Sequence, residues 1–153
     1  MNKTLQNVKE FHATFGHPVV ENPSIPSKER CELRVRLIQE ELDELKEAIE
    51  QGDLVECADA FADLQYVLNG AVLEFGLGNK FDELFQEVQS SNMSKACDSE
   101  EVAIETQSHY SAKGISTVIT QVGLKWVVSR TSDNKILKNV YYHETALEPI
   151  LNS

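Results

Sequence analysis

Long apolar runs are missing from this sequence of 153 residues, and none approaches the roughly 18 residues that a membrane-spanning helix requires. We therefore expect no membrane partner. The first residues, MNKTLQNVKEFH, also lack the apolar stretch of a signal peptide, which predicts a cytoplasmic protein. Cysteine is scarce, and Cys31, Cys57 and Cys97 form no CxxC pair. This spacing argues against both a disulfide framework and a zinc knuckle.

Positive charge is scarce as well. Lysine and arginine number 14 against 25 aspartates and glutamates, so the formal net charge is -11. Such a balance argues against nucleic-acid binding, because phosphate backbones favour clustered basic residues. It is compatible with a phosphate-bearing small ligand only if a cation lies between ligand and protein. The hydrophobic content of 41% and the charged content of 25% are ordinary globular values, and the length suits one domain with a real core.

Apolar spacing and helix-end signals predict four helices in the first 90 residues. They cover residues 2–15, about 27–51, about 53–75 and 79–90. Gly16 and the proline-rich loop that follows it end the first helix, and Ser27 is a candidate N-cap for the second. Gly52 and Asp53 form a connection too short for anything but an antiparallel hairpin, and Asn79 is a candidate cap for the fourth helix.

The residue composition and the apolar pattern change after Lys95. Residues 96–114 are polar and weakly patterned, whereas residues 116–142 are rich in β-forming side chains, with SDNK as the predicted hairpin turn. HETALEPIL suggests a short closing helix. We therefore predict a mainly α fold, an antiparallel helical bundle at residues 1–95, followed by a C-terminal extension at 96–153 that carries a small β-hairpin and a short helix.

Ten carboxylates and one lysine occupy residues 40–63, EELDELKEAIEQGDLVECADAFAD. Residues three and four apart are neighbours on a helix, so each acid can be assigned to a face. Asp43, Glu47 and Glu50 adjoin one another and Lys46. This group is typical of a solvated helix face and carries no functional weight.

Four other acids occupy positions where a solvated face is not expected. Glu41 lies within the apolar stripe of its helix and Glu44 borders it, while Asp59 and Asp63 lie on or beside the packing face of the next helix. Ionised carboxylates that face one another between helices are costly without protonation, a basic partner or a multivalent cation. Because this stretch has no arginine, a hard divalent ion is the simplest relief: Mg²⁺, with Mn²⁺ as a second candidate.

Two other patterns of acidic residues bear on the same stretch. Glu56 follows Asp53 at the spacing of a capping box, which favours a structural role for Glu56. A di-iron carboxylate bundle needs Glu-x-x-His on two helices. No histidine of this chain lies three residues after a glutamate, which argues against di-iron.

EELDEL, followed about 20 residues later by DAFADLQYVLNGAVLEFG, resembles the MazG-like, all-α nucleoside triphosphate pyrophosphohydrolase superfamily. This group includes phosphoribosyl-ATP pyrophosphohydrolases and dimeric dUTPases. EFHATFG at 10–16 and FQEVQSSNMSK at 85–95 are similar to segments of the branch with dUTPase-type members. The likeness spans residues 8–95 and extends into DNKILK at 133–138.

The resemblance implies a set of site residues. Its first acidic cluster corresponds to Glu40, Glu41 and Glu44. Asp63, which precedes an apolar run, resembles the aspartate of the ExxD motif, but Ala60 stands three residues before it in place of glutamate. We take Asp59 as the partner of Asp63, and whether Glu56 or Asp59 completes the site stays open.

The implied activity is Mg²⁺-dependent cleavage of the α–β phosphate bond, which yields a nucleoside monophosphate and pyrophosphate. The substrate would be dUTP or another non-standard triphosphate, and the role would be sanitation of the nucleotide pool. Glu41, Glu44, Asp59 and Asp63 would hold the metal, and Glu40 or Glu41 would accept the proton of the attacking water. The implied substrate contacts are His12, Tyr66, Asn69, Asn92 and Lys95. The family also implies a homodimer or homotetramer.

Two rival interpretations do not require turnover. In one, the altered ExxD motif leaves a nucleotide- or metal-binding module of the same fold. In the other, the acids are simply exposed on a helical interaction protein.

Overall fold

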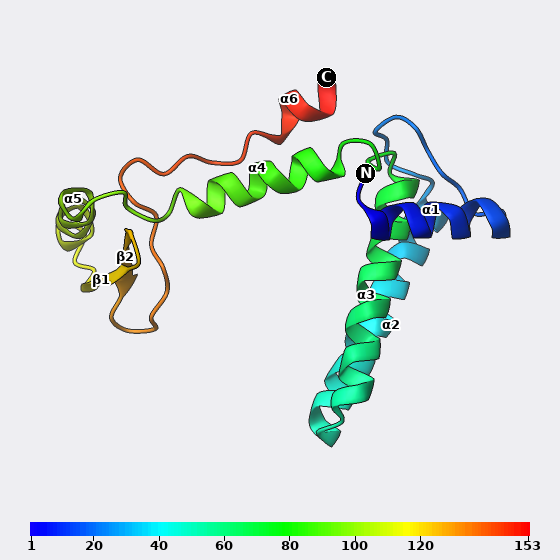
Figure 1. Ribbon diagram of the computed structural model, residues 1–153, viewed down its shortest axis with the longest axis horizontal. Helices are drawn as coiled ribbons and strands as arrows, with labels where there is room; N and C mark the ends of the chain where they lie inside the picture. The colour runs from blue at the N-terminus through cyan, green and yellow to red at the C-terminus, as the bar shows by residue number, and fades with distance from the viewer. The chain divides into compact units, whose positions relative to one another are not determined.

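The structure is a computed structural model that describes residues 1–153, with six helices and one two-stranded sheet (Figure 1). The fold is mainly helical with a small C-terminal hairpin, as predicted. By its contacts the chain divides into two compact units, Met1–Asp82 and Glu83–Ser153. The predicted domain boundary at residue 95 stays a prediction. No helix combines the length and the apolar character needed to cross a membrane.

The first unit contains three helices: α1 at Lys3–Phe15, α2 at Lys28–Gln51 and α3 at Leu54–Glu74. The second and third lie side by side as an antiparallel hairpin (Figure 1). The predicted end signals are confirmed. Ser27 accepts a hydrogen bond from the Arg30 N–H, and Gly52 ends α2 in the left-handed conformation (φ 69°). The Asp53 side chain then caps α3. The hairpin therefore follows from local sequence.

The loop at residues 17–26 closes over the C-terminal end of α3. Val20 and Ser24 donate their backbone N–H groups to the carbonyl oxygens of Leu73 and Phe75, both at 3.0 Å. These bonds satisfy carbonyls that a helix end leaves without partners. Gly76 makes the approach possible, since a Cβ there would lie 1.9 Å from the Asn22 carbonyl oxygen. The loop is thereby fixed against the hairpin.

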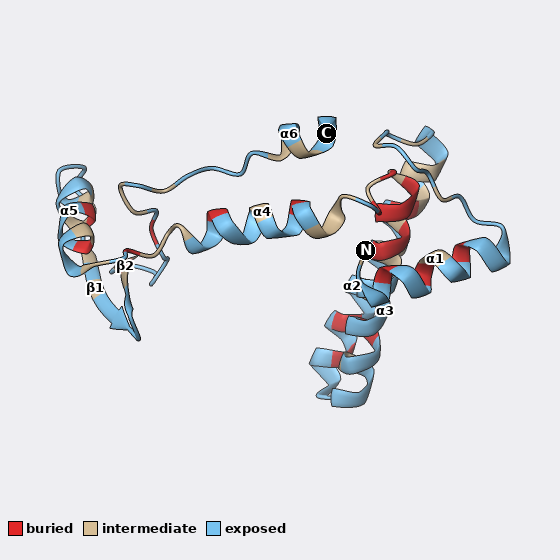
Figure 2. Cartoon of the chain, turned by 45° about the horizontal axis from the view of Figure 1, so that its top comes forward, coloured by how far each residue is buried: buried red, intermediate tan, exposed pale blue.

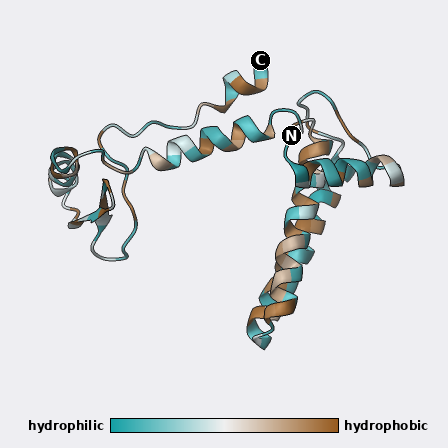
Figure 3. Cartoon of the chain, in the orientation of Figure 1, coloured by the Kyte–Doolittle hydropathy of each residue, from teal (hydrophilic) through white to brown (hydrophobic).

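The core of the first unit lies where α1 crosses the hairpin. It consists of Leu5, Val8, Val72 and Leu73, with partly buried apolar neighbours around them. Figure 2 shows that the buried residues of α3 gather in its C-terminal half. The end near Gly52 carries exposed apolar side chains instead, and Figure 3 colours much of the ribbon there brown, the colour of hydrophobic residues. Packing therefore secures one end of the hairpin much more than the other.

The second unit contains most of α4 at Phe81–Met93, α5 at Glu100–Ser111, β1 at Thr117–Val122, β2 at Lys125–Arg130 and α6 at Leu147–Asn152. The prediction for α4 was close, since the helix begins two residues after Asn79, whose side-chain amide donates to Glu21 at 3.4 Å. The capping role of Asn79 stays a prediction. The closing helix predicted in HETALEPIL is confirmed as α6.

Helix α5 was not predicted, because residues 96–114 are polar and show only a weak apolar pattern. Ser99 accepts a hydrogen bond from the Val102 N–H and caps the helix, and two glutamates occupy its first turn. Ala103 packs with Cys97 and Val128 in a small core against the sheet. Tertiary contact with the β-hairpin of β1 and β2 therefore stabilises a helix whose own apolar face is short.

The hairpin turn was predicted at the wrong place. Val122 pairs with Lys125, so the connection is the two residues Gly123 and Leu124. Gly123 has a positive φ of 60°, which such tight turns require at their first position. SDNK instead follows β2 and brings the chain back along its other edge, where the Arg130 N–H donates to the Lys135 carbonyl oxygen at 2.9 Å.

Candidate active site

The acidic cluster, defined as Glu40, Glu41, Glu44, Asp59 and Asp63, lies on the seam between α2 and α3. Only Glu41 is partly buried, and the other four side chains are exposed. Glu44, Asp59 and Asp63 lie beside the seam, close enough for their charges to act on Glu41, but their side chains are exposed to solvent. The expectation that these three are buried charges is therefore corrected. The burial argument applies to Glu41 alone.

Glu41 is surrounded by negative charge. Burial raises the pKa of its carboxyl above the ordinary value, and the charges of Glu44, Asp63, Glu40 and Asp59 raise it further. Two of these neighbours come from the same helix and two from α3, so the hairpin does bring both halves of the cluster together.

Cations do not neutralise this charge. The cluster's single ion pair joins Glu40 to Arg36 at 3.8 Å, and Glu41, Glu44, Asp59 and Asp63 have none. Lys46 contacts Asp43 on the opposite face, as predicted for the solvated acids.

The ligand chemistry of the cluster suits a hard divalent cation, because every side chain offers carboxylate oxygen. No group of three or more His, Cys, Asp or Glu side chains is arranged to hold a metal ion as the structure stands. Binding would need rotamer changes, which would break no hydrogen bond or ion pair at Glu44, Asp59 or Asp63. The residues therefore fit the metal in type but are not pre-arranged for it.

Glu56 does not form the predicted capping box. The Asp53 carboxylate accepts from the N–H groups of Val55 and Glu56 at 2.9 and 3.1 Å, which is half of the motif. The reciprocal bond is absent, because the Asp53 N–H donates to the Ala48 carbonyl oxygen at 3.0 Å. Glu56 is exposed and unpaired. The predicted capping role of Glu56 is therefore wrong, and its carboxylate makes no bond within the chain.

A cavity of about 230 Å³, called here the seam cavity, opens between α1, α2 and α3. It is lined by Val8, Phe11, His12, His17, Arg30, Leu33, Arg34, Leu37, Tyr66, Val67 and Gly70. Leu37 precedes Glu41 by one turn on α2, and Tyr66 follows Asp63 by one turn on α3. The cavity and the acidic cluster are therefore neighbours along the seam.

A buried ion network forms one end of this cavity. Glu74, with only 1% of its side chain exposed, accepts hydrogen bonds from both Arg30 and Arg34. Burial alone would raise the pKa of Glu74, but the hydrogen bonds and charges of the two arginines bring it below its ordinary value. Sequence reasoning missed this network. The available signal was an arginine pair and a glutamate at apolar positions of adjacent helices.

His12 belongs to the same network and is 2% exposed. Its Nδ1–H donates to the Pro18 carbonyl oxygen at 2.8 Å, and its Nε2 accepts from Arg34 at 3.3 Å. Arginine only donates and a carbonyl only accepts, so these partners assign the neutral Nδ1–H form. Burial lowers the pKa of His12, and the hydrogen bond to Pro18 opposes this less strongly. His12 is therefore a neutral acceptor at the cavity wall.

The other predicted substrate contacts are placed as follows. Tyr66 lines the seam cavity, whereas Asn69 is 1% exposed and accepts from Gln65 at 2.8 Å. Asn92 and Lys95 lie at the end of α4 and just beyond it, and the Lys95 Nζ donates to the Asn92 side chain at 2.7 Å. Their roles toward a substrate stay predictions.

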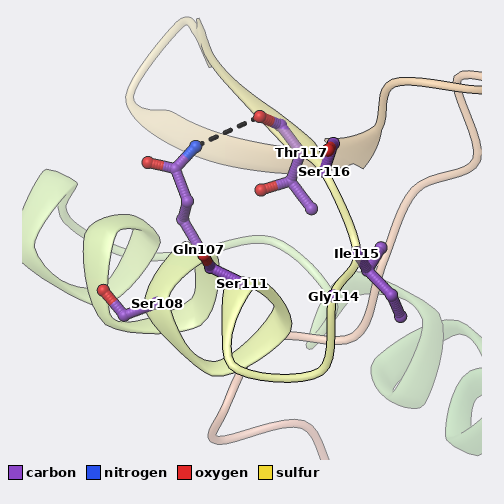
Figure 4. A pocket seen from close by; sticks show the side chains of 7 residues that line it. All are labelled: Gln107, Ser108, Ser111, Gly114, Ile115, Ser116 and Thr117. Carbon is purple, nitrogen blue, oxygen red and sulfur yellow. Dashed lines mark hydrogen bonds between the residues drawn. The ribbon is translucent and has the colours of Figure 1, made fainter.

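A wider hollow of about 610 Å³ lies in the second unit between α5 and β1. Figure 4 shows its lining at residues 107–117, where Gln107 donates to the Thr117 carbonyl oxygen at 3.2 Å. Small polar side chains, Gln107 and Ile115 surround it, and no titratable group does. The hollow therefore lacks the means for acid–base or metal chemistry.

An antiparallel helical hairpin with carboxylates gathered on its seam defines an all-α protein with a carboxylate-rich site. The family model described as phosphoribosyl-ATP pyrophosphohydrolase matches residues 8–92, more than half of the chain. The chain therefore belongs to this family, and its resemblance to the MazG-like superfamily is confirmed. Membership supports a nucleotide pyrophosphohydrolase activity in general, a hydrolysis of an acid anhydride.

One relative comes from a giant virus. The chain is 25% identical to "Uncharacterized protein L479" of Acanthamoeba polyphaga mimivirus, across 90% of this chain and 91% of the viral protein.

Proposed function

We propose that this chain is a Mg²⁺-dependent nucleoside triphosphate pyrophosphohydrolase that cleaves the α–β phosphate bond and releases a nucleoside monophosphate and pyrophosphate. The observation that carries the proposal is the position of Glu41, partly buried on the seam and faced by four carboxylates without a cation in contact with it. Such an arrangement is unfavourable by itself and becomes favourable once positive charge arrives with the ligand.

The roles of the chain's own residues follow from their positions. Glu41, Glu44, Asp59 and Asp63 would hold the metal, with Glu56 as a further ligand beside Asp59. Mg²⁺ in this place would supply the positive charge that lets an acidic protein bind and polarise a triphosphate. Glu40 or Glu41 would accept the proton of the attacking water, since an accessible carboxylate can act as a general base. We propose dUTP or another non-standard triphosphate as the substrate.

We also propose that the chain assembles as a homodimer or homotetramer. Several large apolar side chains of the hairpin are exposed, among them Leu54 at 81%, Val55 at 75% and Phe61 at 60%. An apolar surface of this kind is typical of a protein–protein interface. Sedimentation of the purified chain tests the assembly.

One observation favours a second candidate, a binding module of the same fold without turnover. Ala60 stands where ExxD would place a glutamate before Asp63, and it is only 4% exposed. Position 60 therefore points into the packed seam and offers no ligand. The site must rely on Glu56 and Asp59 instead.

The decisive experiment measures pyrophosphate release from a panel of ribo- and deoxynucleoside triphosphates with and without Mg²⁺. Glu41→Gln should lower kcat/KM by about 10²–10⁴-fold, the range of a lost general base, and Asp63→Asn should lower kcat/KM by weakening Mg²⁺ binding. Glu47→Gln is the matched control, because Glu47 lies on the solvated face of the same helix and contacts only Gln51. Mg²⁺ binding without release supports the binding module. Unchanged activity and unchanged Mg²⁺ affinity in both site variants would rule out the proposed site.

A further inference from the structure

The seam cavity contains a buried cation whose hydrogen-bonding capacity is mostly unused. The Arg34 side chain is 8% exposed, and its Nη2 donates to Glu74 and to His12. Its Nε is fully buried without a partner, and its Nη1 makes no hydrogen bond. Native proteins rarely leave buried donors of a charged group unpaired. Of these two groups only Nη1 keeps exposed surface, so Nη1 is the group of Arg34 that can donate to an acceptor in the cavity.

The charge at this end of the cavity is also unbalanced. Arg30 and Arg34 bring two positive charges against the single negative charge of Glu74, and His12 is held neutral by its hydrogen bonds. An electron-rich oxygen is therefore favoured here. An amino group would place N–H against N–H and leave both sides without a partner.

The walls of the cavity are aromatic and aliphatic. Phe11 lies edge-on to Tyr66 at 5.7 Å and stacks on His17 at 5.8 Å. At about 230 Å³ the cavity is smaller than the ~300–1,000 Å³ of pockets for drug-sized ligands. This space suits one planar ring system. It does not suit a triphosphate, which carries several negative charges and would meet apolar walls and one uncompensated positive charge.

We propose that the seam cavity binds the base of the nucleotide and that Arg34 selects bases with a carbonyl oxygen where cytosine and adenine carry an amino group. The inference rests on the proposed function and names the substrate class of the same site. Because Tyr66 and Leu37 lie one turn from Asp63 and Glu41, a base in the cavity directs the phosphates toward the acidic cluster.

Gly70 lets the Arg34 guanidinium reach this position. A Cβ at residue 70 would lie 2.6 Å from Arg34 Nη1 and 3.1 Å from His12 Nε2. Gly70→Ala therefore moves the guanidinium without removing its charge. This variant tests the role of Arg34 a second time while Arg34 and its partners Glu74 and His12 all remain present.

Matched pairs of substrates isolate the selected group. UTP and CTP differ at one position of the pyrimidine, carbonyl against amino, and ITP and ATP differ in the same way on a purine. We expect kcat/KM to favour UTP over CTP and ITP over ATP by roughly ten- to a hundredfold, the range for a hydrogen bond from a charged donor. Arg34→Met and Gly70→Ala should bring both ratios toward one.

Lys28→Met is the matched control, since Lys28 is an exposed cation on the same helix that contacts only Glu32. It should leave both ratios unchanged. Thermal unfolding of each variant verifies folding, and Gly70→Ala keeps the test valid if Arg34→Met does not fold.

The outcomes separate this inference from the proposed function. If pyrophosphate is released but the wild-type ratios are near one, or both variants keep the wild-type ratios, the base assignment is overturned and the activity stands. If no triphosphate is cleaved, calorimetry with α,β-methylene-UTP and α,β-methylene-CTP decides: tighter binding of the uridine analogue, lost in Arg34→Met, supports the cavity's role. Pyrophosphate binding that depends on Arg34 would instead place phosphate in the cavity and overturn the inference.

Discussion

The backbone N–H of Asp53 donates to the carbonyl oxygen of Ala48 at 3.0 Å, across the tight turn that joins α2 to α3. This bond occupies the donor that a capping box would offer to Glu56. The Glu56 carboxylate is consequently exposed and unpaired, one turn before Asp59. The turn that makes the hairpin thus also leaves the Glu56 carboxylate without a capping bond.

Glu56→Gln should distinguish a role of Glu56 as a metal ligand from a role as a helix cap. We expect the variant to lose Mg²⁺ affinity by about ten- to a hundredfold, as for groups that support metal sites. Its free energy of unfolding without metal should change by less than about 0.5 kcal/mol, as for an ordinary surface substitution. Titration calorimetry and urea unfolding measure the two quantities.

Asp53→Ala should do the reverse. It should lower the free energy of unfolding by about 1 kcal/mol, because an N-cap is lost, and leave the Mg²⁺ affinity intact. A Glu56→Gln variant that is destabilised with full Mg²⁺ affinity would restore the capping role.

Glu74 should make the protein sensitive to acid. Its pKa in the folded state lies below its ordinary value, despite burial, because Arg30 and Arg34 hold the charged form. Its contribution to stability is therefore fully present above the ordinary value of 4.5 and is lost as the pH falls through the lower, folded-state pKa. Urea unfolding between pH 7 and pH 3 should show this loss.

Glu74→Gln should remove that contribution at every pH and cost about 3 kcal/mol at pH 7, because it leaves two arginines without their carboxylate. The exposed Glu47→Gln should follow the wild-type pH curve. If Glu74→Gln lost stability on acidification as steeply as the wild type does, another carboxyl group would be responsible.

Gly123→Ala tests the position of the hairpin turn. Gly123 has a φ of 60°, a region where other residues are strained, so the variant should lose about 1 kcal/mol or more. Leu124→Ala is the control, since Leu124 is 92% exposed and has no positive φ. Hydrogen exchange of the β1 and β2 amides reports the local stability. Equal protection in Gly123→Ala and the wild type would contradict the assigned turn.

The helices of the first unit were predictable because their signals are local. Ser27, Gly52 and Asp53 each act within a few residues of their own position, through a side-chain cap or a left-handed backbone. Helix α5 and the Gly123 turn were missed for the opposite reason. A short apolar face and a two-residue loop carry little signal until the helix and the hairpin pack against each other.

The candidate site likewise has features that the sequence predicts and features that depend on packing. Periodicity alone identified Glu41 as an acid in an apolar stripe, and the structure confirms that it is partly buried and faced by acids from both helices. Periodicity overestimated the burial of Asp59 and Asp63, because the hairpin is thin at that end and leaves its seam open to solvent.

By itself the sequence determined the helical hairpin, its tight turn and the two acidic segments, since each depends on residues within a turn or two of one another. Only the tertiary structure decided that Arg30 and Arg34 pair with Glu74, 44 and 40 residues away, and enclose a cavity beside the acids. The physical reason is register. The antiparallel alignment of α2 with α3 selects which side chains meet. This alignment cannot be predicted from the residue spacing along either helix.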